Sequence, residues 1–77
     1  MNNDRQSGVI KRLIPDRGFG FIRTSSGREI FFHVRALADG VDFEALEQGQ
    51  AVVFVEGKDA TGRPRAVDVQ LVSGIRE

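Results

Sequence analysis

Three phenylalanines and a histidine recur at alternate positions in two neighbouring segments of the chain. Phe19 and Phe21 stand in the first segment, and Phe31 and His33 stand in the second. Residues two apart in a β-strand share a face, so a hairpin of these segments would gather the four rings on one surface. A soluble protein rarely leaves such a surface in water unless it binds something. Because bases stack on exposed rings, the pattern predicts a binding surface for single-stranded nucleic acid.

The charges of the chain balance in sum but not in position. The sequence has 11 Lys and Arg residues and 11 Asp and Glu residues. Residues 1–35 hold seven basic and three acidic side chains, whereas residues 36–77 hold four basic and eight acidic ones. The basic half contains the four rings, and a basic field beside an aromatic surface attracts phosphates. The alternative is that these charges are ordinary solvated side chains on strand surfaces.

His33 is the one side chain that suggests catalysis or metal binding. The sequence contains a single His and no Cys, and no Ser, Asp or Glu stands at a spacing that fixes it against His33. It also lacks a glycine loop of the phosphate-binding kind. These observations favour a stacking and hydrogen-bonding contact with a base. We therefore expect no enzymatic activity, no metal, no cofactor and no small-molecule substrate.

Length and composition indicate one small domain outside the membrane. The chain has 77 residues, which suffice for a single core of modest stability. No apolar run approaches the ~20 residues of a membrane span. The polar stretch 1–7 lacks the apolar centre of a signal peptide, and the absence of cysteine suits a reducing compartment. These features predict a cytoplasmic protein without membrane association.

Five short segments have the apolar, β-branched character of strands, and turn residues separate them. They cover residues 8–14, 17–23, 28–34, 50–56 and 64–72, with a short helical turn at 42–47. Five strands with little helix predict an all-β domain, either a small five-stranded antiparallel barrel or a sandwich, and closure into a barrel would remove the exposed strand edges. We place the domain at residues 7–72 and expect flexible ends at 1–6 and 73–77.

Some positions within these strands carry more specific expectations. The neighbouring apolar pairs 9–10 and 13–14 indicate a β-bulge or burial on both faces of the first strand. Gly18 and Gly20 either leave room for packing behind the rings or let a ligand lie flat against them. The inward-facing sets are expected to be Ile30, Phe32 and Val34 in the third strand and Val67, Val69 and Leu71 in the fifth.

The segment 17–22 fits an aromatic motif that occurs in RNA-binding proteins of two unrelated folds. In the RNA-recognition-motif fold a second aromatic motif precedes this one, and two amphipathic helices cover the sheet. Here the second motif follows, and the sequence shows no helical period of that length. The chain instead resembles a bacterial cold-shock domain, a small member of the OB-fold class. The matching segments are 8–11, 16–22, 30–34, 47–50 and 66–69, together with Phe43.

The resemblance covers about residues 7–72, and it implies a Greek-key barrel that binds single-stranded RNA and DNA with little sequence preference. It also implies an RNA-chaperone role that affects transcription or translation in the cold-shock response. Together with the ring pattern, it selects a set of candidate binding residues. They are Lys11, Arg12, Arg17, Phe19, Phe21, Arg28, Phe31, His33 and Phe43.

The candidate residues divide by expected role. Lys11, Arg17 and Arg28 are expected to contact phosphates or base edges. Phe43 is expected to act either as a flanking platform for a base or as an anchor that holds its loop against the barrel.

The chain departs from the family pattern at three positions. Cold-shock proteins usually have Trp and Phe on the binding face where this chain has Arg12 and Leu13, and they commonly have Phe where it has Val34. Arg12 is expected to stack its guanidinium on a base or to meet a phosphate. These departures and the zero net charge leave a second function open, in which the rings bind a protein partner or a second copy. We expect a monomer, or a dimer under that alternative.

Overall fold

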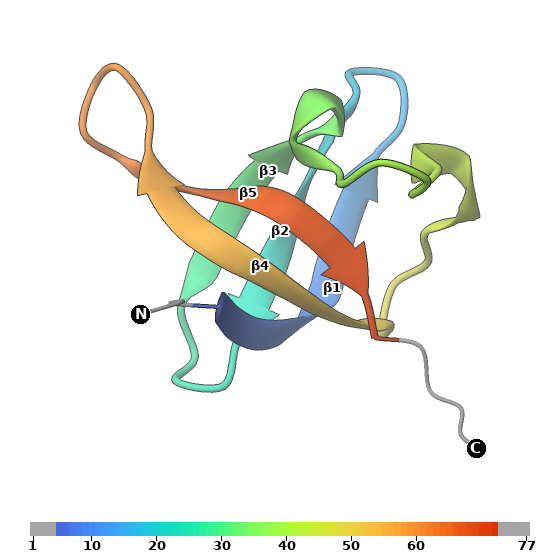
Figure 1. Ribbon diagram of the computed structural model, residues 1–77, viewed down its shortest axis with the longest axis horizontal. Coiled ribbons are helices and arrows are strands. Elements are labelled where there is room, and N and C mark those ends of the chain that lie inside the picture. The colour runs from blue at the N-terminus through green and yellow to red at the C-terminus, as the bar shows by residue number, and fades with distance from the viewer. Residues whose placement is uncertain (1–4, 73–77) are drawn as a thin grey trace.

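The computed structural model describes residues 5–72, so most of the ends expected to be flexible, 1–4 and 73–77, lie outside the described chain. Within that range the elements are β1 (Arg5–Ile14), β2 (Phe19–Thr24), β3 (Glu29–His33), η1 (Val34–Ala36), η2 (Phe43–Ala45), β4 (Ala51–Lys58) and β5 (Pro64–Leu71). The two η elements are single turns of 3-10 helix, and both lie on the connection from β3 to β4 (Figure 1).

The strands form a closed barrel in the order β1-β2-β3-β5-β4, with β4 pairing back onto β1. This confirms the predicted five-stranded, all-β barrel. All neighbouring pairs are antiparallel except β3 and β5, which meet in parallel where Phe31 lies opposite Arg65. Figure 1 shows the β4–β5 hairpin crossing over the meander of β1, β2 and β3. β1 begins at Arg5, so Arg5 and Gln6 belong to the sheet rather than to the expected flexible end.

The first strand contains the β-bulge that its doubled apolar pairs indicated. Ile10 pairs with Ile22, but Arg12 pairs with Phe21, so Lys11 is the extra residue. A bulge of one residue reverses the side on which the following side chains lie. The bulge therefore places Arg12 on the same outer face as the Phe21 ring.

A hydrogen-bonded loop before β4 holds this bulge in place. Gly49 N donates to Ile10 O over 2.8 Å, and Ile10 N donates to Gln50 O over 2.9 Å. The side chain of Gln48 adds a bond from Nε2 to Lys11 O at 2.8 Å. The backbone that presents Arg12 is thus fixed from the neighbouring loop.

The buried side of β5 differs from the expected set of Val67, Val69 and Leu71. Ala66 and Val69 are buried, whereas Val67 is only partly buried and Leu71 flanks the core. The register with β4 shifts by one extra residue in β5, and Asp68 there adopts a φ of +53°. The bulge brings residues three apart to the same face, so the expectation of simple alternation was wrong for this strand.

The core lies along the axis of the barrel and includes residues from all five strands. Its members are Ile10, Ile22, Ile30, Phe32, Ala36, Leu46, Val52, Phe54, Ala66 and Val69. The predicted burial of Ile30 and Phe32 is confirmed. A Cβ placed on Gly20 would lie 2.9 Å from the Phe32 ring and 2.7 Å from Arg12 O. Gly20 therefore leaves room for core packing directly behind the outer rings.

Val34 does not continue the inward side of β3 as expected. It begins η1 and is partly buried, and its backbone N donates to Gly18 O over 2.8 Å. Gly18 has a φ of +75°, a conformation that glycine adopts at little cost. This contact joins the start of β2 to the end of β3, and so fixes one end of the ring-bearing hairpin.

Candidate nucleic-acid interface

Four rings lie on the outer surface of the β2–β3 hairpin, and we call them the aromatic face: Phe19, Phe21, Phe31 and His33. The register pairs Phe21 with Phe31 and Phe19 with His33. Paired residues share a face, and the intervening Gly20, Ile22, Ile30 and Phe32 are buried. All four rings are partly exposed, so the hairpin brings them together as the sequence predicted.

The three phenylalanine rings contact one another. The centroids of Phe19 and Phe31 are 5.3 Å apart, those of Phe19 and Phe21 are 5.9 Å apart, and those of Phe21 and Phe31 are 6.0 Å apart. The planes of Phe19 and Phe21 meet at 88° and those of Phe21 and Phe31 at 71°. Such edge contacts are favourable arrangements for aromatic pairs. The rings are therefore held in place before any ligand arrives, which lowers the entropy cost of binding.

A backbone hydrogen bond orients the imidazole of His33. Nδ1 accepts from Arg35 N over 3.1 Å, and the side chain thereby caps the start of η1. A neutral imidazole that accepts at Nδ1 carries its proton on Nε2. His33 therefore adds a ring and a hydrogen-bond donor to the aromatic face.

The basic candidates near the face differ in whether they already have a partner. Arg12 lies beside Phe21 on the outer face and is exposed, and Arg17 is exposed in the turn between β1 and β2. Within residues 5–72, neither forms an ion pair. Lys11 is also exposed, and its Nζ lies 3.1 Å from Glu29 Oε2. Two guanidinium groups near the rings are thus available to phosphate.

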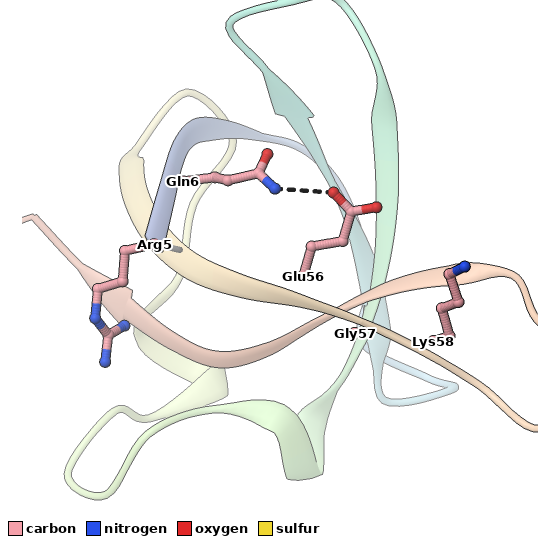
Figure 2. A pocket seen from close by; sticks show the side chains of 5 residues that line it. All are labelled: Arg5, Gln6, Glu56, Gly57 and Lys58. Atoms are coloured by element: carbon pink, nitrogen blue, oxygen red, sulfur yellow. Dashed lines mark hydrogen bonds between the residues drawn. The ribbon is translucent and has the colours of Figure 1, made fainter. Parts of the chain in front are cut away.

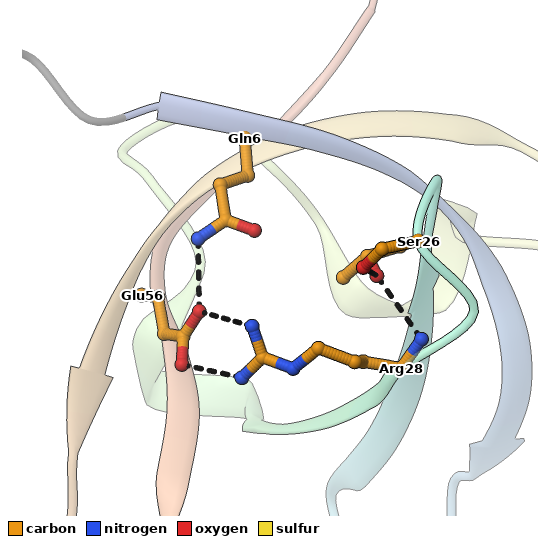
Figure 3. Close-up of polar contacts among 5 residues, drawn as sticks. Gln6, Ser26, Arg28 and Glu56 are labelled. Atoms are coloured by element: carbon orange, nitrogen blue, oxygen red, sulfur yellow. Dashed lines mark hydrogen bonds and ion pairs between the residues drawn. The ribbon is translucent and has the colours of Figure 1, made fainter.

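Arg28 lies in a different environment, at one end of the barrel. Its Nη1 and Nη2 donate to the two carboxylate oxygens of Glu56 at 3.0 and 2.6 Å, and Gln6 Nε2 donates to Glu56 Oε1 at 2.8 Å (Figure 3). We call these three residues the Glu56 cluster. The bonds from Arg28 and then Gln6 lower the pKa of the Glu56 carboxyl, and Glu56 raises that of Arg28. The structure thus gives the Arg28 guanidinium to a carboxylate, and the phosphate contact expected for it remains a prediction.

A wide hollow of about 520 Å³ opens beside the Glu56 cluster. Figure 2 shows Gln6 and Glu56 bonded across it, with Arg5 and Lys58 extending on opposite sides. Arg5 forms an ion pair with Asp68. The hollow therefore combines charges that are mostly paired already, unlike the surface around Arg12.

Phe43 and Leu13 lie apart from the aromatic face. Phe43 packs against the core from η2, and its ring centroid is 6.3 Å from that of Phe32. This placement favours a loop anchor over a flanking platform. Leu13 pairs with Gly20 and packs against the core, so the bulge turns it away from the binding face that the resemblance implied.

The structure also brings residues to the rings that the sequence did not point to. Arg65 of β5 lies opposite Phe31 through the parallel pairing. Asp59 and Arg63 from the loop between β4 and β5, and Pro64 at the start of β5, line a hollow together with Phe21 and Phe31. The sequence showed this loop only as a polar tract, because a parallel contact between distant strands leaves no local signal.

Among residues 5–72, no group of three or more His, Cys, Asp and Glu side chains is placed to hold a metal ion. No helix in the same range is long and apolar enough to cross a membrane.

Comparison with known proteins agrees with the barrel and its rings. Residues 6–72 match the family described as the 'Cold-shock' DNA-binding domain. The chain is 37% identical over 71 residues to cold shock protein CapB of Pseudomonas syringae pv. tomato, covering 91% of this chain and 99% of that one. It is 39% identical over 70 residues to the major cold shock protein CspA of Pseudomonas aeruginosa, with the same coverage.

A solved structure supports the fold independently. The barrel superimposes on Drosophila Unr CSD456 with a TM-score of 0.76 at 23% identity, over 94% of this chain and 28% of that longer one. The strand order, the paired aromatic motifs and the family match over residues 6–72 lead to one conclusion: this chain belongs to the cold-shock domain family.

Proposed function

We propose that this protein binds single-stranded RNA and DNA with little sequence preference and acts as an RNA chaperone. Membership in a family of nucleic-acid-binding domains supports the general activity. The observation that carries the finer proposal is the contact between the Phe19, Phe21 and Phe31 rings on an outer face. Rings that are fixed and partly exposed offer stacking surfaces to any base, because every base has a π-face.

Electrostatics supports the same ligand class. Arg12 and Arg17 are exposed near the rings and form no ion pair within residues 5–72. A guanidinium beside stacked bases can contact the phosphates that link them. A duplex offers phosphates as well, but its base faces are hidden. We therefore infer that the protein distinguishes single strands from duplex by stacking and not by charge.

Fluorescence anisotropy with labelled single-stranded RNA, single-stranded DNA and a blunt duplex tests this proposal. Single strands should bind more tightly than the duplex. Phe31→Ala should weaken single-strand binding by about 1–3 kcal/mol, which is roughly a ten- to hundred-fold loss. Phe43→Leu, which alters a ring packed against the core, is the matched control and should change affinity much less. A preference for duplex, or full binding by Phe31→Ala, would contradict the stacking mechanism.

The chaperone role has a separate test. An RNA hairpin with a fluorophore and a quencher at its ends reports opening as the temperature rises. The protein should lower the melting temperature of the hairpin, because it binds the open strand and shifts the equilibrium toward it. The Phe31→Ala variant should lower the melting temperature of the hairpin less than the wild type does. If the protein binds single strands yet leaves the melting temperature of the hairpin unchanged, the binding proposal stands and the chaperone proposal is wrong.

We further propose that the protein works as a cytoplasmic monomer. Two of the departures that favoured self-association do not lie on the aromatic face, since Leu13 packs against the core and Val34 lies in η1 near Gly18. Sedimentation velocity at several concentrations should show one monomeric species. A tight dimer that releases on addition of oligonucleotide would instead support the use of the rings in self-association.

A further inference from the structure

A small hollow beside the aromatic face has a chemical character of its own. It measures about 300 Å³, and Phe21, Phe31, Asp59, Arg63 and Pro64 line it. That volume is at the lower end of the range for small-molecule sites, ~300–1,000 Å³. The rings of β2 and β3 form one side, and the loop between β4 and β5 forms the other. The hollow therefore brings the two rings and the charged side chains of the loop around one space.

The loop is closed by its own hydrogen bonds, and these fix the Asp59 carboxylate. Oδ1 accepts from Thr61 N at 2.8 Å, Thr61 Oγ1 at 2.6 Å and Arg63 N at 3.0 Å. The backbone adds bonds from Asp59 N to Arg63 O at 2.9 Å and from Gly62 N to Asp59 O at 3.0 Å. The three bonds to Oδ1 also lower the pKa of the Asp59 carboxyl, so it is charged at neutral pH. The other carboxylate oxygen, Oδ2, accepts no hydrogen bond within residues 5–72.

A carboxylate is an unusual neighbour for a nucleic-acid strand, because it repels phosphates. It does accept hydrogen bonds from the N–H groups of bases. Arg63 follows four residues later and lines the same hollow, so a donor group accompanies the acceptor. The loop thus presents one negative and one positive side chain next to the stacking rings.

The four bases differ in how they match this pair of charges. Guanine carries two adjacent donors at N1 and N2 and two acceptors at O6 and N7, and Arg commonly reads the latter two. Uracil and thymine present a single donor at N3, flanked by two carbonyl oxygens that a carboxylate repels. Cytosine and adenine each offer one amino group beside a ring-nitrogen acceptor. Guanine therefore matches Asp59 and Arg63 best, and uracil or thymine matches Asp59 worst.

We propose that the hollow bounded by Phe21, Phe31, Asp59 and Arg63 is a base-selective subsite that prefers guanine over uracil and thymine. The proposal rests on the single-strand binding proposed above and adds a preference to it. Asp59 Oδ2 accepts from the N1–H and N2–H groups, and Arg63 donates to the acceptor edge. Elsewhere on the aromatic face the rings accept any base.

The test compares a thymine heptamer with the same strand carrying one central guanine, in anisotropy titrations at fixed salt. The wild type should bind the guanine strand about ten-fold more tightly, which is the scale of one good base-edge contact. Asp59→Asn is the informative variant. Asn keeps an Oδ1 that accepts the loop bonds, but it has an NH₂ donor in the place of Oδ2. The variant should lose the guanine preference while it still binds the thymine strand.

Asp42→Asn is the matched control. Asp42 also accepts a backbone bond, from Glu44 N at 3.1 Å, and it lies in a turn outside the hollow. This control removes the same charge and should keep the guanine preference. If Asp59→Asn keeps the preference, or changes both affinities as Asp42→Asn does, the subsite proposal is wrong. If the wild type binds no single strand at all, the proposed function fails first, so the two failures are distinguishable.

Arg63→Gln covers the case in which Asp59→Asn disturbs the loop. The amide resonances of Thr61 and Gly62 report loop geometry, and they should stay near their wild-type positions in both variants. If Asp59→Asn shifts them strongly, Arg63→Gln decides the question, because the backbone bond from Arg63 N to Asp59 does not depend on its side chain. Arg63→Gln should reduce the guanine preference, and an unchanged preference would overturn the proposal.

Discussion

One exposed arginine lies beside the aromatic face and another lies in the Glu56 cluster, but only the arginine in the cluster has an acidic partner. Arg28 donates two hydrogen bonds to Glu56, whose remaining partner is Gln6. Arg12 lies beside Phe21 and has no acidic partner within residues 5–72. The same residue type therefore contributes to the barrel in one place and remains available to a ligand in the other.

The comparison shows that neither sequence position nor exposure alone separates an arginine that has an acidic partner from one that does not. Both lie in the basic half of the chain, and both are exposed. The difference is that Arg28 has an acidic partner, Glu56, which follows it by 28 residues in the sequence. Changes to the aromatic face should therefore alter binding, and changes to the Glu56 cluster should alter stability.

The largest effect is expected from the rings. Phe19→Ala removes one of the three contacting rings, and it should weaken single-strand binding by about 1–3 kcal/mol. Glu56→Gln, the matched change in the other region, should leave binding unaltered. Anisotropy titrations of both variants check this, and an equal loss of affinity in the two would remove the distinction between the regions.

The second largest effect is expected from the backbone behind the rings, where a substitution should lower the stability of the fold. Gly20→Ala places a Cβ 2.9 Å from the Phe32 ring and 2.7 Å from Arg12 O, and the overpacking should cost about 1–3 kcal/mol. Gly57→Ala is the control, since its Cβ would lie 3.9 Å from Val67 Cγ1. Urea unfolding measures both. Equal stability of the two variants would contradict the packing role of Gly20.

Glu56→Gln should destabilise the fold by about 1 kcal/mol at neutral pH, since it weakens charged hydrogen bonds at a site where solvent screens them in part. Arg28 and Gln6 lower the pKa of Glu56 below its ordinary value of 4.5. The stabilisation is therefore fully present above that value and is lost as the pH falls through the lower folded-state pKa. The difference between wild type and variant in urea unfolding should shrink below about pH 4.5. A difference that stays constant down to acid pH would contradict this role.

The smallest effect is expected at Arg12. Arg12→Ala should reduce affinity only a few-fold, but it should lower the salt dependence of binding by about 0.7 in the slope of log K against log salt, the value for one phosphate contact to a single strand. Arg5→Ala, which removes an arginine already paired with Asp68, is the control and should leave the slope unchanged. Titrations at four salt concentrations measure the slopes. Identical slopes for wild type and Arg12→Ala would show that Arg12 contacts no phosphate.

Much of the fold followed from local pattern. The alternation of Phe19, Phe21, Phe31 and His33 predicted their common face, and the doubled apolar pairs indicated the bulge in β1. These features depend on residues that are neighbours in a strand or in a hairpin, where the period of two is enough.

The features that local pattern did not give depend on distant contacts. The bulge at Asp68 changed the buried side of β5, and nothing in the alternation of that strand marked it. The pairing of Arg28 with Glu56 joins the β2–β3 turn to β4, and the parallel contact of β3 with β5 brings Asp59 and Arg63 to the rings. Such contacts arise from closure of the barrel, so they became visible only in three dimensions.

The central proposal is that the rings of the aromatic face, and not the paired charges of the Glu56 cluster, provide the main contact with the ligand. Titration of ¹⁵N-labelled protein with a short single-stranded oligonucleotide, followed by two-dimensional NMR, tests it most directly. The largest shift changes should fall on the amides of Arg12, Phe19, Phe21, Phe31 and His33, and those of Gln6 and Glu56 should barely move. Shift changes concentrated at Gln6, Arg28 and Glu56, with an unaffected aromatic face, would contradict the account.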